Sequence, residues 1–148
     1  MADSNWPPLE SDPSLFTAYM QECGMPSTWG FSELYGFDDE LLDMVPKPVV
    51  AVVVNFEKVD NGEMNIMGFQ EYESRYFMNQ SGALDNACGV IACLHAIYNN
   101  LEQITVAEGT ILRNFHDQVK DMDGWGRADA LENFAAFKSV HQTHAAAG

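Results

Sequence analysis

The sequence predicts an α/β (α+β) fold in which helices pack around a buried strand, and two segments carry that prediction. Residues 86–100 are apolar almost all round, which is typical of a helix in the middle of a domain. Residues 48–56 are rich in valine, and neither face turns polar. Such a run predicts a buried central strand. Because 47% of the 148 residues are apolar, we expect a real core within one domain, residues 1–148.

The N-terminal part of the chain predicts an extended arm followed by a helix. Residues 1–11 are expected to be extended. Asp12 suits the N-cap position and Pro13 suits the first position of a helix, whereas Gly24 is a typical stop signal. A helix is therefore expected from Pro13 to about Glu22.

The middle of the chain predicts three further elements before the central helix. Residues 38–44 indicate a short acidic helix. Residues 57–73 are typical of a surface loop, because they include an Asp-Asn-Gly sequence. Residues 75–78 are expected to form a short strand that leads into the turn before the central helix.

The C-terminal part predicts two helices separated by a break. Thr105-Val106-Ala107-Glu108 matches a capping box, which would open a helix that ends near Val119. Residues 121–126 predict the break. The last helix is expected from Ala128 to about Ala145, with one stripe formed by Ala130, Phe134, Phe137, His141 and His144.

The charge balance excludes one class of partner. The chain has 22 acidic and 7 basic residues, for a formal net charge of −15. Nucleic acid is excluded because so few cations would neutralise its phosphates, whereas a basic protein partner fits the charge. The longest apolar run, residues 49–54, is far too short to span a membrane. Since the N-terminus also lacks the pattern of a signal peptide, we expect a cytoplasmic or nuclear protein.

The three cysteines form no disulfide framework, and one of them occupies a special position. Cys88 lies where the central helix is expected to begin. The unpaired N–H groups and the positive dipole end of a helix favour a thiolate there, and the thiolate is the nucleophile in cysteine hydrolysis. The alternative is that Cys88 is a small buried residue, as most free cysteines are. The residue and its position alone leave both interpretations open.

None of the four histidines is placed by the sequence as a base for Cys88. His95 shares a helix face with Cys88, but seven residues separate them by about 10 Å along the helix axis, too far for direct proton transfer. His116 falls in the middle of a helix, where a solvated or structural role is expected. His141 and His144 have a spacing that suits two metal ligands, yet no third ligand is evident. We therefore expect no metal and no other cofactor.

Four segments, in the same order along the chain, carry a family resemblance. They are Trp6-Pro7-Pro8-Leu9-Glu10-Ser11-Asp12-Pro13, residues 34–52, residues 75–100 with Asn86-Ala87-Cys88-Gly89 at their centre, and Leu131-Glu132-Asn133 with Thr143-His144. Together they resemble the ubiquitin C-terminal hydrolases, which are papain-like cysteine proteases that release groups from the carboxyl end of ubiquitin. The resemblance covers nearly the whole chain.

The resemblance implies a fold and a set of site residues. The fold is papain-like, with helices flanking a central, mostly antiparallel sheet, here with its later strands missing, so that residues 1–148 form a single but incomplete domain. Cys88 would be the nucleophile, and the side-chain amide of Gln80 would stabilise the oxyanion beside the backbone N–H of Cys88. The residues that would contact ubiquitin belong to the arm: Pro8, Leu9, Glu10 and Ser11. The same arm fits equally well as a strand that covers the core.

Two departures from the family pattern bear on activity. Five residues usually separate the glutamine from the cysteine, whereas seven separate Gln80 from Cys88, and the two extra ones fall within residues 81–85. The family's catalytic histidine and aspartate follow the last helix, and the chain shows no match to them. Met122-Asp123-Gly124-Trp125 echoes that motif with a tryptophan in place of the histidine, but it precedes the last helix.

The expected function is therefore that of a cysteine-type deubiquitinase, a hydrolase of bonds at the C-terminal glycine of ubiquitin. This chain would supply only the nucleophile half of the site and would show little or no activity by itself. The alternative is a noncatalytic, truncated form that binds ubiquitin or interferes with its processing. The expected partners are ubiquitin and its C-terminal conjugates.

Overall fold

The computed structural model describes residues 6–56, 75–84 and 86–147. Within these ranges the chain forms six α-helices and one short 3₁₀-helix, and it contains no strand. In chain order they are α1 (Pro13–Cys23), α2 (Asp39–Asp43), η1 (Gly82–Leu84), α3 (Cys88–Tyr98), α4 (Ile111–Val119), α5 (Gly124–Glu132) and α6 (Ala135–Ala147). None of these helices has the length and apolar character needed to cross a membrane.

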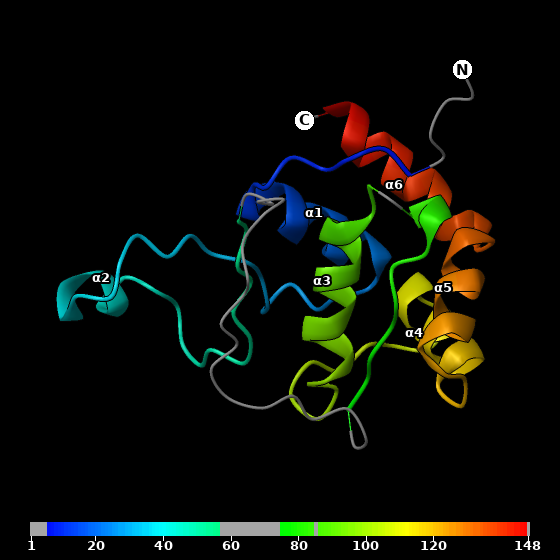
Figure 1. Cartoon of the computed structure of the whole chain (residues 1–148). Helices are drawn as coiled ribbons and strands as arrows, with labels where there is room; N and C mark the ends of the chain where they lie inside the picture. The colour runs from blue at the N-terminus through cyan, green and yellow to red at the C-terminus, as the bar shows by residue number, and fades with distance from the viewer. Residues whose placement is uncertain (1–5, 57–74, 85, 148) are drawn as a thin grey trace, which may run out of the picture.

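Helix α3 lies in the middle of the molecule, with α1 packed against it and with α5 and α6 to its right in Figure 1. Helix α1 packs against both α3 and α6, and α5 contacts α4, α6 and η1. Six of the eleven residues of α3 are buried and four more are half-buried, which confirms the prediction of an interior helix. The core is completed by aromatic and aliphatic side chains from every long helix, among them Tyr19, Leu94, Phe115, Leu131 and Phe137.

The predicted central sheet is wrong. The segment expected to be its buried strand, residues 48–56, is extended but pairs with no strand of the described chain. Val52 and Val54 are 71% and 72% exposed, and Val50 is half-buried against the core, so the segment is not a buried strand. Apolar residues alone do not make a strand, because each backbone N–H and C=O also needs a partner. The short strand predicted over residues 75–78 is likewise extended chain without a ladder.

The first helix is confirmed together with its stop and start signals. The carboxylate of Asp12 accepts a hydrogen bond from the backbone N–H of Ser14 at 2.8 Å, and Pro13 opens α1. Gly24 ends the helix with a φ of 123°, a conformation that favours glycine. A Cβ on Gly24 would also lie 2.4 Å from the Cβ of Thr110, so this turn has no room for a side chain.

The C-terminal helices begin and end elsewhere than the sequence predicts. Helix α4 starts at Ile111 because Thr110, not Thr105, accepts the capping hydrogen bond, from the N–H of Arg113. The expected break at 121–126 already contains the start of α5, which Asp123 caps. The single last helix is in fact two, α5 and α6.

Two predictions remain, the short acidic helix over residues 38–44 and the loop over residues 57–73. The short acidic helix is confirmed as α2, which projects away from the other helices (Figure 1). The loop predicted over residues 57–73 lies outside the described residues.

Candidate active site

Cys88 is the first residue of α3 and its side chain is exposed, as the nucleophile interpretation requires. The N-cap residue, Ala87, makes no side-chain hydrogen bond to the first turn. The other two cysteines, Cys23 and Cys93, are buried. Burial raises the pKa of Cys23 to about 12, with Glu22 adding to the effect, and burial also raises the pKa of Cys93.

The N-terminal arm lies against the first turn of α3. A Cβ added to Gly89 would be 3.4 Å from a methyl carbon of Leu9, which shows how closely the arm approaches the residue after Cys88. Leu9 is half-buried, whereas Pro8, Glu10 and Ser11 are exposed. Leu9 therefore packs against the core, although not as part of a strand, whereas its neighbours face solvent.

The arm is fixed to the C-terminal helix by a buried histidine. The Nε2 of His141 lies 2.6 Å from the carbonyl oxygen of Pro7, and its Nδ1 lies 3.2 Å from the hydroxyl of Tyr19. The ring of Trp6 packs on the same histidine with a centroid distance of 4.9 Å. With Nε2 donating to Pro7 and Nδ1 accepting from Tyr19, this contact needs a neutral imidazole, and burial lowers the pKa of His141 accordingly.

Gln80 ends the extended segment that runs beside α3 in the opposite direction, from the C-terminal end of the helix toward η1 (Figure 1). Its Nε2 donates to the carbonyl oxygen of Leu84 at 2.9 Å. Leu84 closes η1, the turn that contains the extra residues between Gln80 and Cys88. The turn therefore engages the amide group that the resemblance assigns to the oxyanion.

The four histidines have structural contacts, and within the described ranges none hydrogen-bonds Cys88. His95 accepts from the N–H of Met78, in agreement with the expectation that it is no base for Cys88. His116 packs on the rings of Tyr76 and Tyr98. His144 lies beside the Glu22 carboxylate. Nor do three or more histidine, cysteine or acidic side chains gather as a metal site in this part of the chain.

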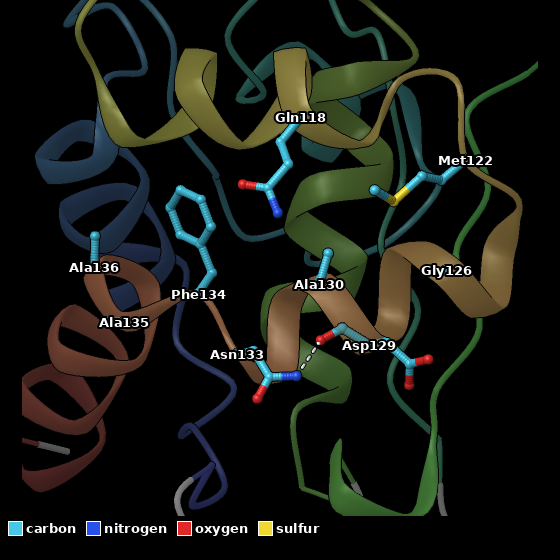
Figure 2. A pocket seen from close by; sticks show the side chains of 9 residues that line it. All are labelled: Gln118, Met122, Gly126, Asp129, Ala130, Asn133, Phe134, Ala135 and Ala136. Atoms are coloured by element: carbon cyan, nitrogen blue, oxygen red, sulfur yellow. Dashed lines mark hydrogen bonds between the residues drawn. The ribbon is translucent and has the colours of Figure 1, made fainter.

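A pocket of about 570 Å³ lies away from these residues, between the end of α4 and the junction of α5 and α6. Figure 2 shows its walls, with Gln118 from α4 facing Ala130 and Phe134, and with Asn133 donating to the backbone oxygen of Asp129. Neither Cys88 nor Gln80 lines it. The candidate site is therefore an exposed helix end rather than this cavity.

Sequence reasoning missed one residue near the site, Arg127. Its guanidinium group donates to three backbone oxygens, those of Phe77, Val119 and Lys120, at 2.8 to 3.0 Å. It also lies 4.4 Å from the centroid of the Tyr76 ring, as in a cation–π contact. No periodic pattern in the sequence marks Arg127.

Comparison with known proteins identifies the wider group. The family model described as ubiquitin carboxyl-terminal hydrolase, family 1, matches residues 6–148. A probable ubiquitin carboxyl-terminal hydrolase of Dictyostelium discoideum is 33% identical over 97% of this chain and 59% of its own length. Ubiquitin carboxyl-terminal hydrolase 3 of Arabidopsis thaliana is 34% identical over 99% of this chain and 65% of its own length. A ubiquitin carboxyl-terminal hydrolase of Aplysia californica is 32% identical over 95% and 66%. The chain thus spans 59–66% of the length of these relatives.

Proposed function

Because the chain belongs to the ubiquitin carboxyl-terminal hydrolase family, we propose that it acts in the thiol-dependent hydrolysis of bonds at the C-terminal glycine of ubiquitin. The observation that carries this proposal is the exposed thiol of Cys88 at the first residue of a helix that is otherwise mostly buried. The substrates would be ubiquitin C-terminal esters, thioesters or amides. A cytoplasmic or nuclear place of action stays a prediction from the sequence.

The proposed reaction begins with attack of the Cys88 sulfur on the carbonyl carbon of the terminal glycine. The negative charge that develops on the carbonyl oxygen would be stabilised by the backbone N–H of Cys88 and by the side-chain amide of Gln80. The leaving group departs with a proton, and water then hydrolyses the thioester and frees the sulfur. Gln80 must release the carbonyl oxygen of Leu84 to take this part.

The described residues place no histidine as a general base in this arrangement. No histidine hydrogen-bonds Cys88 in the described parts of the chain, and each has other contacts. We therefore propose that these residues supply the nucleophile and the oxyanion donors but no histidine base. The 148-residue chain by itself would then form and hydrolyse the thioester slowly.

The exposed part of the arm supports a role in binding. Pro8, Glu10 and Ser11 are exposed beside the first turn of α3, where a peptide tail would have to lie to reach the Cys88 sulfur. Glu10 supplies a negative charge, which suits a tail that carries arginine. We propose that this edge guides the C-terminus of ubiquitin to the thiol.

Labelling with ubiquitin that carries an electrophile at its C-terminus tests the proposal. We expect one covalent adduct, at Cys88, located by mass spectrometry after digestion, and no adduct with the Cys88→Ala variant. Iodoacetamide is the matched control, because it reacts with an exposed thiol without needing ubiquitin recognition. If iodoacetamide modifies Cys88 but the ubiquitin reagent does not, the proposed function is wrong.

A second candidate function is that of a noncatalytic protein that binds ubiquitin. It is favoured by the contrast between an exposed arm and a thiol without a hydrogen-bonded histidine in the described chain. Titration of ubiquitin against the Cys88→Ala variant separates the two cases. Binding without any labelling or turnover by the unmodified chain supports this candidate, whereas absence of binding at high micromolar ubiquitin removes it.

A further inference from the structure

Residues 76–80, here called the 76–80 segment, lie outside any helix or strand as an extended trace (Figure 1), and their backbone is hydrogen-bonded to residues of two helices, α3 and α5. The segment leads directly to Gln80 and runs beside α3 (Figure 1). One bond comes from backbone, between the N–H of Asn79 and the carbonyl oxygen of Gly124 in α5, 3.1 Å apart. A Cβ on Gly124 would lie 2.3 Å from the side-chain oxygen of Asn79, so a larger residue here would require the Asn79 side chain to move. The other bonds come from side chains.

Asn99, at the C-terminal end of α3, pairs with both backbone groups of Tyr76. Its Oδ1 accepts from the N–H of Tyr76 at 2.7 Å, and its Nδ2 donates to the carbonyl oxygen at 3.0 Å. The same Nδ2 also lies 2.9 Å from the carbonyl oxygen of His95, which fixes the amide on the helix. A carboxamide that pairs with both groups of one residue imitates a neighbouring strand.

His95 and Arg127 extend the pairing toward Gln80. The Nε2 of His95 accepts from the N–H of Met78 at 3.1 Å, which requires the tautomer with its proton on Nδ1. The ring of His95 stacks on Phe77 with a centroid distance of 5.5 Å. Arg127 donates to the carbonyl oxygen of Phe77 at 2.8 Å from the side of α5. Consecutive residues of the segment are thus hydrogen-bonded to residues of α3 and of α5 in turn.

These contacts fix a register between the segment and α3. Tyr76 pairs with Asn99 and Met78 with His95, so two extended residues correspond to four helical residues. The lengths agree, because two extended residues rise about 6.6 Å and four helical residues about 6 Å. One further step of the same register would bring Gln80 opposite residue 91, which is about one helical turn from Cys88.

We propose that His95, Asn99 and Arg127 are positioning residues that set where Gln80 stands relative to Cys88, and through this register govern the stabilisation of the oxyanion. The proposal rests on the proposed function, because it assigns the amide of Gln80 to the reaction. None of the three residues touches the reacting atoms. Their effect would be on acyl transfer, where charge develops on a carbonyl oxygen, and not on the thiol itself.

His95→Phe tests the proposal because it keeps an aromatic ring on Phe77 and removes the acceptor for the N–H of Met78. His95→Gln is the conservative partner, since the Oε1 of glutamine lies as many bonds from the backbone as the Nε2 of histidine. His116→Phe on α4 is the control, because His116 also packs on Tyr76 but makes no hydrogen bond to the described segment. Gln80→Ala, alone and combined with His95→Phe, completes the set.

Two reactions of Cys88 are measured in the full chain. The first is acylation by ubiquitin with an activated C-terminal ester, and the second is alkylation by iodoacetamide, which forms no oxyanion. We expect His95→Phe to slow acylation on the order of 10- to 100-fold and to leave alkylation within about twofold. His95→Gln should restore most of the rate, and His116→Phe should behave as the unmodified chain. The double variant should be no slower than Gln80→Ala, because both changes act on one donor.

The opposite results would overturn the proposal. They are an unchanged acylation rate in His95→Phe, a parallel loss of alkylation, or a double variant whose loss is the product of the two single losses. Failure of the proposed function looks different, because then the unmodified chain is not acylated at all. In that case amide hydrogen exchange decides the register, with the N–H of Met78 expected to exchange faster in His95→Phe but not in His95→Gln. Equal exchange in both variants would show that His95 does not hold the segment.

Discussion

Two extended segments of this chain lie near α3 and differ in how their backbones are satisfied. In the 76–80 segment, side chains of Asn99, His95 and Arg127 pair with the backbone, and Met78 is 2% exposed. Residues 50–56 are rich in valine, yet Val52 is 71% exposed. Within the described chain these residues make no backbone–backbone hydrogen bond, and the side chain of Asn55 donates to the Ser11 hydroxyl at 3.0 Å. The difference teaches that polar partners, and not apolar content, decide which extended segment is held in place.

The largest expected effect comes from removing Arg127. Arg127→Leu breaks charge-assisted hydrogen bonds to three carbonyl oxygens and the contact with the Tyr76 ring, so we expect the free energy of unfolding to fall by about 3 kcal/mol. Urea unfolding measures the change. Arg113→Leu is the matched control, because its ion pair with Asp117 is exposed and contributes at most about 0.5 kcal/mol. Equal losses in the two variants would show that the carbonyl contacts of Arg127 do not stabilise the fold more than an exposed ion pair does.

The second-largest effect is expected on acidification, which should weaken the hydrogen bonding of the 76–80 segment. Burial, with a smaller contribution from the charge of Arg127, lowers the pKa of His95 from its usual 6.5. Because the folded pKa is below the unfolded one, the stabilisation is complete above about pH 6.5 and is lost as the pH falls below it, when the open state takes up the proton. We expect the hydrogen-exchange protection of the Met78 amide, corrected for intrinsic rates, to fall severalfold from pH 7.5 to pH 5.5.

Two comparisons show whether that loss of protection belongs to His95. In His95→Gln the pH dependence should weaken at Met78, since no imidazole remains to be protonated. The amides of residues 50–56 should show little protection at either pH. An unchanged pH dependence in His95→Gln would assign the effect to another group, such as the buried His141, whose pKa burial also lowers.

The smallest effect is expected in residues 50–56. Val52→Thr exchanges a methyl group for a hydroxyl on an exposed side chain, so we expect a change in the free energy of unfolding within about 0.5 kcal/mol. Val90→Thr is the same substitution at a fully buried position of α3 and should cost about 2 kcal/mol. Thermal or urea unfolding compares them. A loss at Val52 as large as that at Val90 would mean that another surface covers the segment in solution.

The sequence predictions were accurate where neighbouring residues decide the structure, and they failed where residues far apart in the sequence decide it. The start and stop of α1 were predictable because Asp12, Pro13 and Gly24 act on their own few residues. The start of α4 was not, since Thr105 and Thr110 both suit an N-cap and the choice depends on the turn at Gly109, whose φ is 84°. Arg127 was missed because its three acceptors come together only in the folded chain.

The sequence by itself determined the family, the interior character of α3 and the place of Cys88 at its first residue, because local patterns and helix periodicity encode these features. Only the tertiary structure decided which extended segment is held and which is not. Valine content predicted a strand at 48–56, but hydrogen-bond partners for a backbone are set by what lies beside it in space. For residues 76–80 those partners are side chains 17 to 50 residues further along the chain, a pairing that no local pattern contains.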